Sequence, residues 1–178
     1  MTMPDNSGIV QLNLMKRKLI IAYGNPDRQD DGAGWYTLEK TAQKIGVAFS
    51  GYNDDFYARL GNSPDFFFSL QLTPEMSDLI KNYDEVCFID ASVGTGSREL
   101  EILKLIPAYQ FSPLSHHMSP QSLLDISKSM NEYSPISFLL TIPGKDFGFI
   151  NTLSNQALTA SETAIGWLLD WINQDIEQ

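Results

Sequence analysis

The stretch KLIIAYGNPDRQDDGAG, residues 18–34, joins a strand pattern, a turn and the start of a helix pattern. Its apolar run at 19–22 predicts a buried strand over about 18–23, which stops at the Gly-Asn-Pro turn at 24–26. A helical pattern follows the turn. Open α/β sheets place their ligand sites at such points, outside the carboxyl ends of the strands. The stretch therefore predicts both a fold class and the place to look for a site.

The turn carries three acids, Asp27, Asp30 and Asp31, followed by Gly32 and Gly34. A Gly-rich turn at this position usually binds phosphate through backbone N–H groups and a helix N-terminus. Three carboxylates would instead repel a phosphate and attract a cation. A simpler interpretation is a solvated loop in which Asp30 or Asp31 caps the following helix. Residues further along the chain bear on this choice.

Length and composition indicate a single domain, 1–178, with a sizeable core and a loosely ordered lead-in at 1–16. The net charge of −10 argues against non-specific binding to nucleic acid or to anionic membranes, since both need basic surface. The single Cys87 excludes an internal disulfide framework, and its apolar neighbours predict a buried structural thiol. No apolar run reaches about 18 residues, so no transmembrane helix is expected. The N-terminus has its basic cluster after its short apolar patch, the reverse of a signal peptide, and a cytoplasmic protein is expected.

Strand and helix patterns alternate along the whole chain, which predicts a three-layer α/β/α sandwich with a mixed, mainly parallel sheet. The apolar stripe of the last helix indicates core packing rather than a cofactor site. Besides the strand at 18–23, we expect strands at 65–72, 85–91, 100–107 and 136–142, with a further one starting at 47–49; helices at 35–45, 73–83, 119–130 and 159–176; and loops at 51–64, 111–118 and 144–155.

Polar residues follow several of these elements. Asp30 and Asp31 follow the first strand, Asp90 ends the strand at 85–91, and His116 and His117, the only histidines, lie in the loop after 100–107. Two parallel strands end at one edge of a sheet, so the carboxylates can converge there. Two carboxylates and an imidazole suit a borderline divalent ion such as zinc or nickel. Taken alone, Asp90 would bond a neighbouring loop, and either histidine would be a loop hydrogen-bonder.

Four blocks in this sequence resemble, in order, those of the nickel–iron hydrogenase maturation proteases. GNPDRQDDGAG (24–34) resembles the family's GN-x(5)-D-[DE]-G-x-G signature, and QLTPEMSDLIKNYDEVCFIDAS (71–92) resembles the block whose strand ends in Asp-Ala. SHHMSP with QSLLDI (115–126) resembles the His-containing loop and its Leu-rich helix. The segment at 142–169 resembles the tail, where a Gly and a Leu-Ser turn precede the last helix.

This resemblance implies an endopeptidase that removes a C-terminal extension from the hydrogenase large-subunit precursor once nickel has been inserted. By position, the family's metal-binding residues fall on Asp31, Asp90 and His116, with Asp30 and His117 as alternates. The nickel would come with the substrate. It would polarise the scissile carbonyl or activate a water, with Asp30 as a base or an orienting group.

Two features depart from the family pattern. Ala22 and Tyr23 stand where the family commonly has Gly-x, which narrows the first turn and adds bulk beside the site, and the segment 51–68 is less familiar. A non-cleaving metal-binding or large-subunit-binding chaperone of the same fold is therefore the alternative function. A nucleotide-binding α/β domain is a third reading, and the acidic turn has the wrong charge for it.

Overall fold

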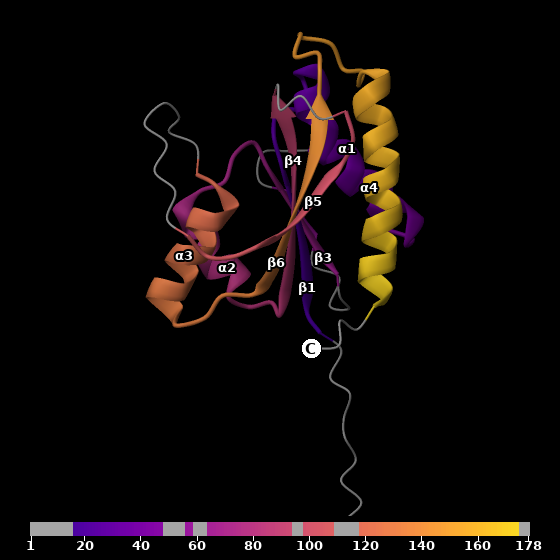
Figure 1. The fold of residues 1–178 in the computed structure, drawn as a ribbon. Helices are drawn as coiled ribbons and strands as arrows, with labels where there is room; N and C mark the ends of the chain where they lie inside the picture. The colour runs from indigo at the N-terminus through magenta and orange to yellow at the C-terminus, as the bar shows by residue number, and fades with distance from the viewer. Residues whose placement is uncertain (1–15, 48–55, 59–63, 94–97, 109–117, 175–178) are drawn as a thin grey trace, which may run out of the picture.

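A computed structural model describes residues 16–47, 56–58, 64–93, 98–108 and 118–174. These residues build one six-stranded sheet in the order β2-β3-β1-β4-β6-β5 (Figure 1). The neighbours β1 and β3, β1 and β4, and β4 and β6 are parallel, whereas the edge strands β2 and β5 run antiparallel. The strands are β1 (Lys18–Tyr23), β2 (Phe56–Ala58), β3 (Asp65–Ser69), β4 (Glu85–Val93), β5 (Glu101–Leu105) and β6 (Ile136–Gly144).

Helices cover both faces of this sheet. The pair α1 (Ala33–Lys44) and α4 (Asn155–Asn173) packs on one face, and α2 (Ser77–Ile80) and α3 (Pro120–Asn131) lie over the other (Figure 1). Alternate residues of β1 enter the two cores: Ile20 and Ala22 pack on the α1/α4 side, Leu19 and Ile21 on the other. Coverage of both faces explains why the central strands read as continuous apolar runs. The predicted three-layer α/β/α fold with a mixed, mainly parallel sheet is confirmed.

The helix predicted at 73–83 is much shorter than expected. A 3₁₀ turn, Pro74–Met76, leads into the four residues of α2. The side-chain amide of Asn82 donates to the carbonyls of Asp78 and Leu79, 2.7 and 3.2 Å away. These side-chain bonds take the place of a further helical turn. The chain can then enter β4 only two residues after Tyr83.

Other elements also differ from the prediction. Helix α4 begins at Asn155, four residues earlier than predicted, because the Ser154 hydroxyl accepts from the Ala157 N–H at 3.2 Å and caps it. The segment at 51–64 contains the short strand β2 and is not loop throughout. Of the strand predicted at 47–49, only Val47 is described, and it lies in no strand.

The single cysteine is buried, as its apolar neighbours in the sequence predict. Cys87 is a free thiol with no exposed surface, and burial raises its pKa well above the ordinary 9.0. Among the described helices, none combines the length and apolar character that a bilayer span requires.

A buried lysine ties the end of the last helix to the first strand. The Lys18 ammonium donates to the carbonyls of Trp171 at 2.6 Å and Ile172 at 3.3 Å, and also to the carbonyl of Gln174. It lies 5.1 Å from the Trp171 ring centroid and 3.9 Å from the buried Glu85 carboxylate. A cation at a helix C-terminus satisfies carbonyls that have no partner within the helix.

Candidate functional site

The turn after β1 folds back on itself through close backbone contacts. Gly24 has φ +126°, and a Cβ there would lie 2.3 Å from the backbone oxygen of Asp31. A Cβ on Gly32 would lie 2.8 Å from Cα of Pro26. Only a residue without a side chain fits at either position. The glycines of GNPDRQDDGAG thus close a compact loop that brings Asp31 back to the end of β1.

Asn25 organises this loop with its backbone and its side chain. Its Oδ1 accepts from the Asp27 N–H at 2.9 Å, and its carbonyl accepts from the Arg28 N–H at 3.0 Å, which closes a turn. Its own N–H donates to Asp31 Oδ2 at 3.1 Å. The Asp31 carboxylate therefore has a set orientation. Neither Asp30 nor Asp31 caps α1. The N-cap residue of α1 is Gly32, and no side-chain hydrogen bond caps the helix.

Asp30 is buried and holds a distant loop. Its Oδ2 accepts from the N–H groups of Lys145 (2.8 Å) and Asp146 (3.0 Å) and from the Ser154 hydroxyl (2.7 Å); its Oδ1 accepts from the Ser154 N–H (2.7 Å). Burial disfavours the charged form, but these hydrogen bonds outweigh it and set the pKa of Asp30 below the ordinary 3.8. Since both oxygens are engaged, we assign Asp30 to anchoring the loop between β6 and α4. We do not assign it the alternate roles of metal ligand or base.

Asp90 lies on β4, paired in register with Thr141 of β6. Tyr23, the last residue of β1, donates its side-chain hydrogen bond to the Asp90 carboxylate. Burial first, then the Asp90 charge and this hydrogen bond, raise the pKa of Tyr23 well above the ordinary 10.0, so the phenol stays protonated. The bulky residue that departs from the family pattern is therefore a direct partner of a predicted ligand.

The start of α1 brings the two acid-bearing strand ends together. A Cβ on Gly34 would lie 2.9 Å from the carbonyl oxygen of Tyr23 and 3.2 Å from that of Ile89, so the helix backbone touches the ends of both β1 and β4. The short 3₁₀ turn Gln29–Gly32, which carries Asp31, also contacts β4. Asp31 and Asp90 thus belong to adjoining segments at the carboxyl edge of the sheet.

The predicted imidazole ligand lies outside the described residues. His116 and His117 fall within 109–117, so the choice between them stays a prediction. Strand β5 runs antiparallel to β6, with Leu105 opposite Ser137, so the segment that precedes this loop leaves the sheet at the other edge. Within the described ranges, no three His, Cys, Asp or Glu side chains are grouped so as to hold a metal. The carboxylates of Asp31 and Asp90 would supply two oxygen ligands to a metal. A third protein ligand or the substrate would have to complete such a site.

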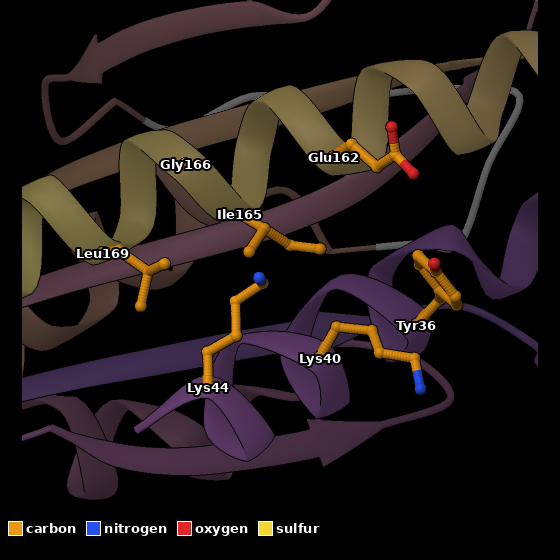
Figure 2. A pocket seen from close by; sticks show the side chains of 7 residues that line it. All are labelled: Tyr36, Lys40, Lys44, Glu162, Ile165, Gly166 and Leu169. Carbon is orange, nitrogen blue, oxygen red and sulfur yellow. The ribbon is translucent and has the colours of Figure 1, made fainter. Parts of the chain in front are cut away.

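A hollow of about 360 Å³ lies elsewhere, between α1 and α4 (Figure 2). It contains none of the predicted site residues. Its lining is mixed, with two lysines and a glutamate beside apolar groups: Tyr36, Lys40, Lys44, Glu162, Ile165, Gly166 and Leu169.

The roles of two residues near the site, Tyr23 and Ser154, are difficult to predict from the sequence. Tyr23 reads as a strand end with excess bulk, and its hydrogen bond to Asp90 depends on the β1–β4 register. Ser154 belongs to a Leu-Ser turn that marks the start of α4, and its second role, donating to Asp30, joins residues 124 positions apart. A polar residue ending an otherwise aliphatic buried strand is the one local signal that points to Tyr23.

Comparison with solved structures relates this architecture to known proteins. No family model and no curated protein matches the sequence. The [NiFe] hydrogenase maturation protease HycI from Thermococcus kodakarensis matches with TM-score 0.61 at 19% identity, over 89% of this chain and 94% of that one. The hydrogenase maturating endopeptidase HybD from Escherichia coli gives 0.60 at 15%, over 87% and 91%. The endopeptidase HycI from Escherichia coli gives 0.57 at 21%, over 88% and 91%. The chain has the fold of the nickel–iron hydrogenase maturation proteases, the family that its four sequence blocks resemble.

Proposed function

We propose that this protein is an endopeptidase that removes the C-terminal extension of a nickel–iron hydrogenase large-subunit precursor. The observation that carries the proposal is that Asp31, in the glycine-closed loop, and Asp90, on β4, lie on adjoining segments of a fold shared with maturation endopeptidases. Adjacent acids in this loop have separate tasks. Asp30 anchors a neighbouring loop, whereas Asp31 is oriented by the Asn25 N–H toward the strand ends.

Asp31, Asp90 and His116, with His117 as the alternate, would recognise a nickel ion that arrives with the substrate. Bound nickel would polarise the scissile carbonyl or activate a water, and so stabilise the anionic tetrahedral intermediate. Tyr23 would fix the orientation of the Asp90 carboxylate through its hydrogen bond. Asn25 does the same for Asp31. Two preset carboxylates lower the reorganisation that catalysis would otherwise need.

Incubation of the purified protein with a nickel-loaded precursor, followed by mass spectrometry, tests this function. We expect loss of a C-terminal fragment, no cleavage by Asp31→Ala or Asp90→Ala, and full cleavage by Asp27→Ala, which changes an exposed acid of the same loop. Metal-free precursor should be cut much more slowly. An active Asp90→Ala variant would contradict the site. Binding of the precursor without cleavage would instead support the chaperone alternative.

A further inference from the structure

The loop between β6 and α4 carries two neighbouring apolar side chains on its surface. Phe149 is 87% exposed and Ile150 is 55% exposed. With Gly148 they form what we call the apolar tip. Single exposed apolar residues are ordinary on protein surfaces, but adjacent ones have a solvation cost that function commonly explains.

The apolar tip is rigidly held. The Gln29 side-chain carbonyl accepts from the Gly148 N–H at 3.2 Å, and the Gln29 N–H donates to the Ile150 carbonyl at 3.1 Å. Gln29 has φ +50°, a left-handed conformation that non-glycine residues seldom adopt. The four hydrogen bonds to Asp30 fix the base of the loop. The Arg28 guanidinium lies 6.0 Å from the Phe149 ring centroid and steadies the ring.

The apolar tip lies at the same edge of the sheet as the candidate site. The loop leaves the sheet at the end of β6, where Gly144 pairs with Val93 of β4, on the edge that carries Asp90 (Figure 1). Gln29, which bonds the tip directly, is two residues from Asp31. Two residues span at most about 7 Å. The apolar tip is therefore anchored close to Asp31, where a protein bound at the candidate site can contact it.

We infer that the apolar tip is a preformed docking element that binds an apolar patch beside the scissile segment of the large-subunit precursor. This inference rests on the proposed function, since it takes that precursor as the occupant. Preorganisation lowers the entropy lost on binding, which is a reason to hold exposed apolar groups on a clamped loop. Apolar side chains on a rigid support are also the usual anchors of protein interfaces.

Biolayer interferometry and cleavage assays with the full-length protein and nickel-loaded precursor test this inference. We expect Phe149→Ser/Ile150→Ser to weaken precursor binding and to raise KM by about 10- to 100-fold, with kcat changed less than about twofold. Met130→Ser is the matched control, since Met130 is 70% exposed and lies in the last turn of α3, six residues before β6 begins at the opposite edge of the sheet. It should leave binding unchanged. Thermal melting of each variant checks that the fold is intact.

The outcomes separate the two proposals. If the double variant binds and cleaves like the wild type, the docking role is wrong and the protease function stands. If the wild type binds without cutting, and the double variant binds more weakly, the docking role stands and the protease function is wrong. Equal losses in the double variant and Met130→Ser would contradict docking, and absence of any binding by the wild type would overturn both.

Discussion

Replacing Asp30 by asparagine should destabilise the protein more than the same replacement of Asp27 or Asp31, the other acids in the loop after β1. The substitution keeps the shape of the side chain and removes its charge. One carbonyl oxygen remains as an acceptor, so the new amide NH₂ must face either the Ser154 N–H or the pair from Lys145 and Asp146. At least one buried donor loses its partner, whichever way the amide turns.

Hydrogen-bond energies give the size of the effect. An unpaired buried donor costs about 1–3 kcal/mol, and the remaining bonds lose the extra strength that a charged acceptor gives them. We expect Asp30→Asn to lower the free energy of unfolding by about 2–4 kcal/mol. For a chain of this length that corresponds to a fall in Tm of roughly 4–16 °C. Asp30→Ala should cost more, because it leaves all four donors without the carboxylate.

The dependence on pH distinguishes a charge effect from a packing effect. The folded pKa of Asp30 lies below the ordinary 3.8. Its stabilisation is therefore complete above the unfolded pKa and is lost as the pH falls through the lower folded pKa. The stability gap between wild type and Asp30→Asn should be constant from about pH 5 to 7 and narrow below about pH 4, by no more than about 1.4 kcal/mol per pH unit.

Urea denaturation followed by circular dichroism at several pH values measures this gap. Asp27→Asn is the matched control, since it removes a charge from an exposed position in the same loop and should change stability by less than about 0.5 kcal/mol. The reasoning fails if the two variants are equally stable at pH 7, or if the gap for Asp30→Asn widens on acidification.

Four further substitutions have expected outcomes. Tyr23→Phe should reduce kcat/KM on the precursor by about tenfold while lowering stability by only about 1 kcal/mol, because it removes the bond that orients Asp90; comparable activity to wild type would exclude a positioning role. Lys18→Met should cost about 2–4 kcal/mol in urea denaturation, since it strips the carbonyls at the end of α4 of their cation, and a loss below about 0.5 kcal/mol would show that water replaces it. Gly34→Ala should destabilise the protein by about 1–3 kcal/mol, because its Cβ would meet two strand carbonyls. Gly166→Ala, which faces open space on α4, should instead stabilise the protein by about 0.5–1 kcal/mol. A change of stability in the same direction for both variants in urea denaturation would contradict the packing argument.

Local patterns in the sequence suffice to predict the central strands and the layer arrangement. β1 and β4 are apolar runs bounded by turn residues, and helices on both faces account for their uniform burial. Boundaries set by side-chain hydrogen bonds are less predictable. Asn82 shortens α2 and Ser154 lengthens α4, each through a bond to a backbone group three or four residues away, and the apolar periodicity that predicts the helices does not contain this information. The three-residue strand β2 lacks a periodicity long enough to recognise.

In the candidate site, the contrast between what local sequence patterns predict and what they leave open is greater still. Asp30 and Asp31 are chemically identical neighbours, so nothing local distinguishes a structural anchor from a candidate ligand. What separates them is the position of three N–H groups between 115 and 124 residues further along the chain, which take up the Asp30 carboxylate. Because that anchor also fixes the loop that carries Phe149, the first acid holds the surface that we propose meets the precursor, while the second lies beside the strand ends. A change at Asp30 should therefore disturb substrate binding while leaving Asp31 and Asp90 in place. The Asp30→Asn variant, assayed with precursor at a temperature where it is fully folded, should raise KM more than it lowers kcat; a pure kcat loss would place Asp30 in the chemistry instead.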